Sequence, residues 1–486
     1  MIEIVKDNFW TIILVLNYLL AASAAATILS KNINPTKTIS YILTLVFFPF
    51  LGLIVYYFFG QEYRKNKIFN RKHILNQNII KSLERDFELD FGQRIKLDHF
   101  LGDKIKLVNL LKKSENSPLT LKNDVELLIN GDVTFDYLLK DLKAAEDHIH
   151  LEYYIFNDDD IGSEIIDILC EKANKGLSVR FSFDSVGSKL SRVTRKKLRE
   201  SGVEFYPFMP VLFKKFTSKM NYRDHRKIAI IDGKVGYLGG INVADNYLNN
   251  RKENKHFWRD THIKLTGESV KPLQVHFLTN WEFVSGQTFK VSKNLFPEAV
   301  ATNGEVAVQI AASGPDTDWA NIMEAIFTAI NTADEYVYIT TPYFIPNEQI
   351  ITALQVAAKS GVDVRLLIPK ISDSWTAKYA SNSYLETLME ADVKVYRYTK
   401  GIIHAKTITV DGVFSSIGTS NMDYRSFNIN FEINALIYNK ELSRQLENQF
   451  MEDLKDAERV DFERWKTRPF HQRAKEAYCR LWSPLL

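Results

Sequence analysis

Two copies of one short pattern constrain this chain more than any other feature of its sequence. The first copy reads YRDHRKIAIIDGKVGYLGGIN over residues 222–242, and the second reads GIIHAKTITVDGVFSSIGTSNMDYRS over residues 401–426. Each contains His-x-Lys, then four residues and Asp, then Gly and Asn at matching distances. A single short match arises by chance, but two copies that agree at all these positions indicate a duplicated unit.

The spacing inside each copy has a direct structural meaning. His and Lys two residues apart on a strand point to the same face. His225 with Lys227, and His404 with Lys406, are therefore predicted to present an imidazole beside an ammonium. An apolar run rich in β-branched residues follows each pair and predicts a buried strand behind it.

An Asp-Gly pair closes each apolar run and predicts a hairpin turn. Asp232 and Asp411 therefore have two interpretations. Each can anchor the turn and the motif, or each can take part directly in the chemistry of a site.

The chain around the motifs repeats as well. Strand-like residues 148–156 and 336–344 each precede a predicted helix, a glycine and a second strand. Strand, helix and strand at this spacing indicate a crossover in a mixed sheet. We therefore expect an α/β fold with two similar halves, at residues 108–295 and 296–486.

These motifs resemble those of the phospholipase D superfamily, whose members carry two HKD motifs, one per half, that meet at a single active site. The resemblance covers most of the chain beyond about residue 110 and is greatest to the bacterial cardiolipin synthases. It implies two pseudo-twofold-related halves, each a mixed sheet flanked by helices. It also implies that His225 is the nucleophile and His404 the general acid and base, although the motifs are symmetrical and leave these roles exchangeable.

Two further carboxylates fit this resemblance. Superfamily members place an acidic residue behind each catalytic imidazole, where it accepts the other ring N–H and fixes the tautomer. The candidates are Asp260 in WRDTH and Glu432 in NFEIN, which follow the two motif histidines by 35 and 28 residues. An ion pair at a strand end is the alternative for either residue.

Phosphodiester chemistry explains the need for two His-Lys pairs. A phosphodiester is anionic and repels nucleophiles, and Lys227 and Lys406 can neutralise it from both sides. Asn242 and Asn421 can donate hydrogen bonds to its non-bridging oxygens. One neutral imidazole attacks phosphorus, while the other, protonated, gives its proton to the leaving alkoxide. Because two ammonium groups take the place of a metal ion, we expect neither a metal nor a cofactor.

Two uncharged stretches lie near the amino terminus, at residues 8–30 and 38–60. Each is long enough to span a hydrocarbon core of about 30 Å. A cleaved signal peptide is the alternative for the first stretch, but the second stretch favours a transmembrane helical hairpin over residues 1–60. Residues 61–107 are polar and are predicted to form a juxtamembrane linker.

Cations around these stretches predict the orientation of the hairpin. Five arginines and lysines follow the second stretch at residues 64–72, against Lys31 and Lys37 in the loop and Lys6 before the first. The larger group stays cytoplasmic, so we expect a multi-pass protein of the bacterial inner or plasma membrane with its large domain in the cytoplasm. The cluster at residues 64–72 can also contact anionic headgroups, or it is an ordinary solvated flank.

The first copy differs from the second by an insertion of 11 residues before its motif, around residues 209–219. It combines apolar residues with three lysines. A loop over the site that touches lipid and a plain surface excursion are both open interpretations.

Composition limits the other classes of function. The net charge of +3 is nearly balanced and, with two membrane spans, argues against a nuclease or another nucleic-acid partner. Cys170 and Cys479 show neither a disulfide framework nor metal-ligand spacing, which favours a reducing compartment. Nothing in the sequence predicts an oligomeric state.

The resemblance implies a transferase that acts on lipid. One phosphatidylglycerol donates its phosphatidyl group through a phosphohistidine and releases glycerol, and a second phosphatidylglycerol accepts the group to give cardiolipin. A membrane anchor favours transfer, since acceptor lipid is concentrated there and water can be excluded. The alternatives are a membrane phospholipase D-type hydrolase, a phosphatidyltransferase with another alcohol, and a catalytically silent membrane scaffold, although two intact motifs argue against the last.

Overall fold

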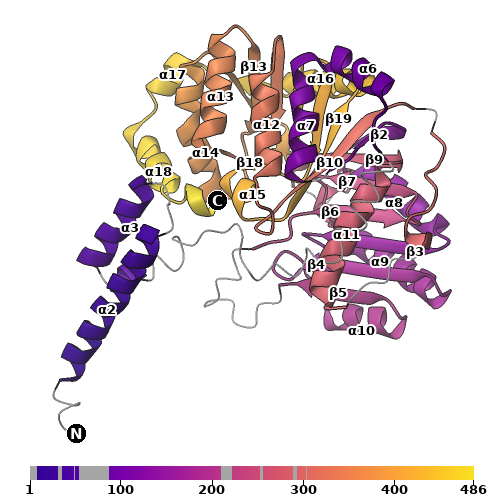
Figure 1. Cartoon of the computed structure of the whole chain (residues 1–486), viewed down its shortest axis with the longest axis horizontal. Helices are drawn as coiled ribbons and strands as arrows, with labels where there is room; N and C mark the ends of the chain where they lie inside the picture. Colours follow the sequence, from indigo (N-terminus) through magenta and orange to yellow (C-terminus); the bar gives the residue numbers. More distant parts are fainter. Residues whose placement is uncertain are drawn as a thin grey trace. The chain divides into compact units, whose positions relative to one another are not determined.

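The computed structural model describes residues 8–30, 35–48, 50–53, 87–115, 117–209, 222–251, 255–287, 293–302 and 304–486. They belong to an amino-terminal unit and a larger α/β unit, which are described separately (Figure 1). Several predicted features lie outside the described residues. These are the last part of the second apolar stretch, the basic cluster after it, and nearly all of the insertion before the first motif.

The amino-terminal unit consists of two packed helices. α2 (Phe9–Ser30) is the one helix among the described residues that is long and apolar enough to cross a membrane by length and composition. α3 (Pro35–Phe47) is shorter, and helix resumes at residues 50–53. Ala21 and Ile28 of α2 pack against Leu45 of α3. The described part of the predicted hairpin is therefore a pair of helices in contact.

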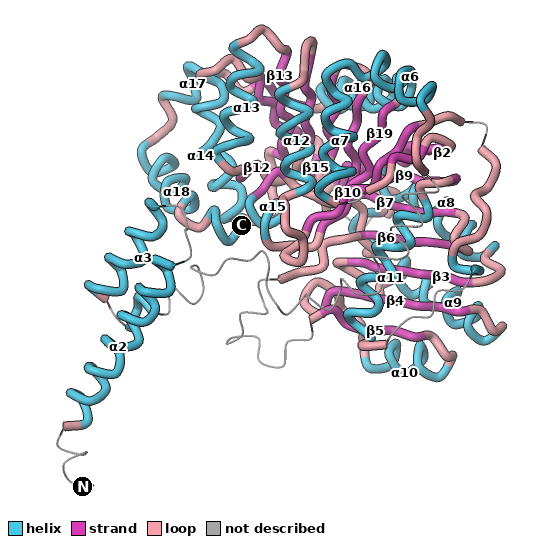
Figure 2. The backbone as a smooth tube through the Cα atoms, viewed as in Figure 1, coloured by secondary structure: helices cyan, strands magenta, loops and turns pink. Residues whose placement is uncertain are grey.

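The larger unit is built on two mixed sheets, one in each half (Figure 2). The first sheet has the strand order β2-β9-β7-β6-β3-β4-β5 and the second has the order β1-β10-β19-β17-β16-β11-β13-β14-β20. Without β1 and β20, the second order matches the first strand for strand. The predicted duplication of an α/β unit is therefore confirmed.

The strands of the first sheet are β2 (Asn123–Ile129), β3 (His148–Tyr153), β4 (Ser178–Asp184), β5 (Glu204–Phe208), β6 (Lys227–Ile231), β7 (Val235–Gly239) and β9 (Thr261–Gly267). The strands of the second sheet are β1 (Leu119–Thr120), β10 (Ala307–Ser313), β11 (Tyr336–Thr340), β13 (Asp363–Pro369), β14 (Lys394–Tyr398), β16 (Thr407–Val410), β17 (Phe414–Gly418), β19 (Glu432–Tyr438) and β20 (Ala457–Arg459).

The helices of the first half are α8 (Asn130–Ala144), α9 (Asp160–Asn174), α10 (Arg192–Glu200) and α11 (Val270–Ser285). Those associated with the second half are α6 (Phe91–Leu101), α7 (Ile105–Ser114), α12 (Asn321–Asn331), α13 (Glu348–Lys359), α14 (Trp375–Met389), α15 (Tyr424–Asn428), α16 (Lys440–Lys455), α17 (Phe462–Lys466) and α18 (Phe470–Arg480). The predicted crossovers are present, because α9 joins the parallel pair β3 and β4 and α13 joins the parallel pair β11 and β13.

Both predicted hairpins are present after the motifs. β6 pairs antiparallel with β7, and β16 pairs antiparallel with β17. The turn residues Asp232 and Gly233 have φ of 54° and 62°, and Asp411 and Gly412 have φ of 51° and 63°. Positive φ at both central residues is the type I′ geometry, whose twist matches that of the flanking strands.

A shared hydrophobic core joins the two halves. Strands β6, β7 and β9 of the first sheet and β10, β17 and β19 of the second contribute to it, together with α11 and α16. Residues 105–120 straddle the predicted start of the first half, yet they lie on the second sheet. β1 pairs with β10, and Leu107, Val108 and Leu111 of α7 are buried in the core of the second half.

Candidate active site

The segment that carries His225 pairs with the second half of the chain. His225 precedes β6, and its backbone N–H donates to the carbonyl oxygen of Phe431 at 2.9 Å. The N–H of Phe431 in turn donates to the carbonyl of Arg223 at 2.9 Å. This short pairing places the next residue, Glu432, beside the first motif.

The segment that carries His404 makes the corresponding contact with the first half. β8 (Phe257–Arg259) runs parallel to β15 (Gly401–Ile403), and the N–H of His404 donates to the carbonyl of Arg259 at 2.7 Å. Asp260 follows directly and reaches the second motif. Each motif therefore pairs with the segment of the other half that immediately precedes its acidic residue, Glu432 or Asp260.

The two acidic residues stand behind the imidazoles, and the pairing crosses between the halves. Nδ1 of His225 lies 2.9 Å from Oε2 of Glu432, and Nδ1 of His404 lies 2.8 Å from Oδ2 of Asp260. Both carboxylates are completely buried. Because Nδ1 is engaged in each ring, Nε2 is the nitrogen left for chemistry. The spacing of these residues in the sequence does not show that each carboxylate contacts the histidine of the other half.

The surroundings of the two carboxylates hold them in place. Glu432 accepts hydrogen bonds from the hydroxyls of Thr419 at 2.6 Å and Ser426 at 2.8 Å. Asp260 accepts the N–H of Thr261 at 2.7 Å. A Cβ at Gly240 would lie 2.1 Å from Oδ1 of Asp260, so only glycine allows this approach.

Burial and charge set different proton affinities on the two histidines. Burial lowers the pKa of His225 well below its usual value, and the ammonium groups of Lys227 and Lys406 lower it further. Burial and Lys406 also lower the pKa of His404, but the carboxylates of Asp260 and Asp373 oppose them. His225 is thus the imidazole held more firmly in the neutral form.

The two motif lysines are buried next to their histidines. Nζ of Lys227 donates to the carbonyl oxygen of His225 at 2.6 Å, and Nζ of Lys406 lies 3.0 Å from Nε2 of His404. Burial and the neighbouring Lys406 ammonium lower the pKa of Lys227 to about 7. Burial lowers the pKa of Lys406 to about 8, against the pull of Asp260. Burial raises the pKa of Glu432 to about 7, which Lys227 opposes.

Both histidines open onto one cavity of about 550 Å³. Asn242 and Asn421, the two predicted anion donors, also line it. The amide nitrogen of Asn242 donates to the hydroxyl of Tyr247 at 2.8 Å, and that of Asn421 donates to Asp423 at 3.0 Å. A primary amide carries two hydrogens, so each side chain keeps one donor for a ligand.

The structure places Asp232 and Asp411 away from this cavity. Each lies beyond the end of the strand that follows its motif histidine, about 20 Å along an extended chain. Asp232 accepts the N–H groups of residues 146, 147 and 148, and Asp411 accepts those of residues 334, 335 and 336. Lys104 also pairs with Asp411 at 2.6 Å. Of the two interpretations left open for Asp232 and Asp411, these contacts match the one in which each aspartate anchors the turn and the motif.

The cavity contains residues that the motif analysis did not select. They are Tyr154, Arg223, Tyr247, Trp258, Tyr343, Asp373, Asp423 and Arg425. Tyr154 contacts the ring of His225, and Trp258 contacts that of His404. Four of them lie in stretches that the sequence analysis quoted: Arg223 in the first motif copy, Asp423 and Arg425 in the second, and Trp258 two residues before Asp260. Tyr154, Tyr247, Tyr343 and Asp373 reach the cavity from segments that carry no motif.

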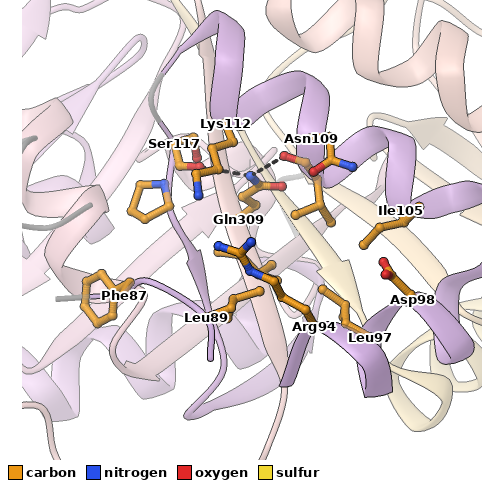
Figure 3. Close-up of a pocket in the computed structure, with 13 residues that line it drawn as sticks. Phe87, Leu89, Arg94, Leu97, Asp98, Ile105, Asn109, Lys112, Ser117 and Gln309 are labelled. Atoms are coloured by element: carbon orange, nitrogen blue, oxygen red, sulfur yellow. Dashed lines mark hydrogen bonds between the residues drawn. The ribbon is translucent and has the colours of Figure 1, made fainter. Parts of the chain in front are cut away.

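A second cavity of about 280 Å³ lies apart from the histidines, between α6, α7, β1 and β10 (Figure 3). Its wall combines apolar side chains with three charged ones, Arg94, Asp98 and Lys112. Gln309 crosses it and donates to the carbonyl oxygens of Val108 and Ser117 at 3.3 and 2.9 Å. Neither motif contributes a lining residue.

Sequence comparison finds close relatives over nearly the whole chain. The family described as cardiolipin synthase, PLD-like domain, matches residues 138–281 and 326–454, and the family described as phospholipase D-nuclease N-terminal matches residues 8–61. A cardiolipin synthase of Geobacillus sp. (strain WCH70) is 42% identical over 94% of this chain and 90% of its own length. One of Clostridium perfringens (strain SM101 / Type A) is 38% identical over 93% of this chain and 95% of its own length.

Among solved structures, a phosphatidylserine synthase of Haemophilus influenzae Rd KW20 has a similar fold. The TM-score is 0.61 with 14% sequence identity, over 78% of this chain and all of that chain. At this identity the likeness concerns the fold alone.

Proposed function

The chain belongs to the cardiolipin synthase family of phospholipase D-like proteins, and on this premise we propose that it joins two phosphatidylglycerol molecules into cardiolipin and releases glycerol. The observation that carries the proposal is the convergence of the two motif histidines on one cavity, each with its own buried carboxylate and with a buried lysine beside it. One neutral and one protonated imidazole are what double displacement at a phosphodiester requires.

In the first half-reaction, Nε2 of His225 attacks the phosphorus of a phosphatidylglycerol. The bond from phosphorus to the glycerol oxygen breaks, and that oxygen takes a proton from His404. Lys227 and Lys406 neutralise the developing negative charge on the non-bridging oxygens. The products are free glycerol and a phosphatidyl group bonded to His225.

In the second half-reaction, the free glycerol hydroxyl of another phosphatidylglycerol gives its proton to His404. Its oxygen then attacks the phosphorus and displaces Nε2 of His225. His225 becomes neutral again and His404 becomes protonated again, so both residues return to their starting states. The proton balance of the full cycle is therefore zero.

The charges around the two rings support this assignment of roles. Asp260 and Asp373 oppose the lowering of the His404 pKa by burial and Lys406, which suits the residue that must start protonated. Arg425 is among the cations that lower the pKa of His225, which suits the residue that must start neutral. The motif sequences alone left the two roles exchangeable.

Membrane attachment is part of the proposal. The homologues and the apolar helix α2 support a membrane-associated protein. We propose that the predicted second span completes a hairpin and leaves the α/β unit on the cytoplasmic side.

The test uses the full-length chain with phosphatidylglycerol vesicles and EDTA, and follows lipid products by mass spectrometry together with free glycerol. Equal amounts of cardiolipin and glycerol are expected. Phosphatidic acid with little cardiolipin would mean that water attacks the phosphohistidine, and the hydrolase alternative would replace the transferase. A reaction that EDTA abolishes would contradict the proposed roles of the two lysines.

A further inference from the structure

Helix α18 (Phe470–Arg480) carries an apolar stripe on its outward face. Within the larger unit, α18 buries only Glu476 and Cys479. Cys479 lies in the core of the second half, and Glu476 pairs with Arg468 at 2.9 Å. The remainder of the helix is exposed. The helix is thus held along one narrow line while most of its circumference faces outward.

The exposed apolar residues recur at helical spacing. Residues 470, 474, 477, 478 and 481 are Phe, Ala, Ala, Tyr and Leu, and steps of three and four place them on one face. Phe470 is 81% exposed, Leu481 75% and Tyr478 55%. Isolated exposed apolar residues are ordinary, but a continuous exposed stripe marks an interaction surface.

Cations flank this stripe on both sides. With 100° per residue, Arg473 and Arg480 lie along one edge, and Lys475 lies along the other. Glu476, the one acidic residue of α18, points inward to Arg468. An apolar stripe bordered by arginine and lysine is the pattern of a helix that lies in a bilayer interface, and the cations match anionic headgroups.

α18 lies next to a helix that contributes to the rim of the catalytic cavity. α18 packs on α14, whose preceding residue Ser374 and first-turn residue Ala377 line that cavity. Trp375, also in the first turn of α14, is 55% exposed and contacts Tyr379. Nζ of Lys475 lies 5.7 Å from the centre of the Tyr379 ring. Aromatic side chains of this kind are enriched where proteins meet the membrane surface.

We propose that the outward face of α18, with Trp375, docks on the surface of an anionic phospholipid bilayer and so sets the mouth of the catalytic cavity at the level of the headgroups. This face acts in addition to the amino-terminal membrane helix. Docking of this face on a bilayer does not depend on the transferase reaction.

The first test places an environment-sensitive fluorophore on Ala477→Cys of the full-length chain, reconstituted in vesicles of phosphatidylglycerol and phosphatidylcholine. Native Cys170 and Cys479 are buried and leave the new thiol as the reactive one among the described residues. We expect blue-shifted emission that phospholipids with a nitroxide on the acyl chain quench. The matched control is a label on Val356→Cys of α13, where the native Val356 is 52% exposed. Its emission should be that of a fluorophore in water.

Equal emission and equal lack of quenching at positions 477 and 356 would overturn the proposal. A blue shift that follows the protein-to-lipid ratio and resists nitroxide lipids would also overturn it, because a second copy of the chain would then be the occupant. Insertion of the label without cardiolipin synthesis would leave docking intact and remove the transferase proposal. Cardiolipin synthesis with the label in water would overturn the docking proposal and leave the transferase proposal intact.

A second test measures turnover. The double variant Phe470→Ser with Leu481→Ser should raise, several-fold, the phosphatidylglycerol mole fraction needed for half-maximal rate in vesicles. Its rate on a short-chain phosphatidylglycerol dissolved as monomers should stay at the wild-type level, which also shows that the variant is folded. Val356→Ser should change neither. An unchanged dependence on mole fraction in the double variant would contradict the docking role.

Discussion

The imidazole of His225 and the carboxylate of Glu432 are separated by 207 positions in the chain, and their Nδ1 and Oε2 atoms are 2.9 Å apart in a buried contact. His404 and Asp260 repeat the relationship in the opposite direction at 2.8 Å. Neither half therefore contains a complete histidine–carboxylate pair. Each half supplies the carboxylate that orients the imidazole of the other, so the site exists only when both halves are folded against one another.

The crossed pairing predicts a specific pattern of chemical rescue. Asp260→Asn should lower the rate by about 100- to 10,000-fold, because less of His404 is then protonated and correctly oriented to act as the acid. A phosphatidyl ester of p-nitrophenol, whose leaving group needs no proton, should restore release of nitrophenol. Glu432→Gln should lose a similar factor through His225, and this ester should not rescue it. Rescue of Glu432→Gln in place of Asp260→Asn would mean that the proposed roles of the two histidines are reversed.

The roles of the histidines can be separated in the same assay. His225→Ala and His404→Ala should both abolish cardiolipin synthesis, because each removes one of the two proposed steps. With the p-nitrophenyl ester, His404→Ala should still release one equivalent of nitrophenol and leave the phosphatidyl group on His225, detectable by mass spectrometry of the protein. His225→Ala should release none. Near-normal cardiolipin synthesis by either variant would exclude the two-histidine mechanism.

Asp411 should matter for stability far more than for turnover. Asp411→Asn disrupts a buried pair with Lys104 and weakens three hydrogen bonds from backbone N–H groups. We expect a loss of about 2–4 kcal/mol in the free energy of unfolding, with the rate of the folded fraction nearly unchanged. Denaturant unfolding and initial rates at low temperature measure the two quantities.

Asp232→Asn is the matched control for Asp411. Asp232 accepts the equivalent three N–H groups, but it has no lysine partner among the described residues. Its substitution should therefore cost less stability. If either variant abolished turnover in fully folded protein, the anchoring interpretation would be wrong.

The two buried lysines predict how the rate depends on pH. Their pKa values of about 7 for Lys227 and about 8 for Lys406 lie below the usual value because of burial. Raising the pH through this range removes protons and with them the charge that neutralises the phosphodiester. The logarithm of kcat/KM should therefore fall on the alkaline side, and each of the two lysines should add one to the limiting slope, beyond the loss of the proton from His404.

Lys406→Arg provides the check on this assignment. A guanidinium keeps its charge throughout this range, so the limiting alkaline slope should drop by one, although the different shape of the side chain lowers the maximal rate. An unchanged slope in this variant would mean that Lys406 does not control the alkaline limb.

The duplication could be predicted because each copy has the same short-range sequence patterns. Apolar strand runs, Asp-Gly turns and the strand–helix–strand order depend on neighbouring residues, and the same seven-strand order in both halves confirms the repeated unit. Helix α2 could be predicted for the same reason, because the length and hydropathy of one continuous segment define it. The motif residues His225, Lys227, His404 and Lys406 were found because they repeat at fixed spacing.

What the sequence alone determined is therefore the repeated unit, its strands and turns, the apolar amino-terminal helix, and the histidines and lysines of the proposed site. The tertiary structure alone decided which carboxylate serves which histidine, the placement of Asp232 and Asp411 outside the cavity, and the presence of Asp373 and Trp258 around it. The physical reason is that these relationships depend on the packing of the two halves. Backbone hydrogen bonds such as those of His225 with Phe431 and His404 with Arg259 join segments that are far apart in the chain. The spacing of residues within a motif does not predict such long-range pairs.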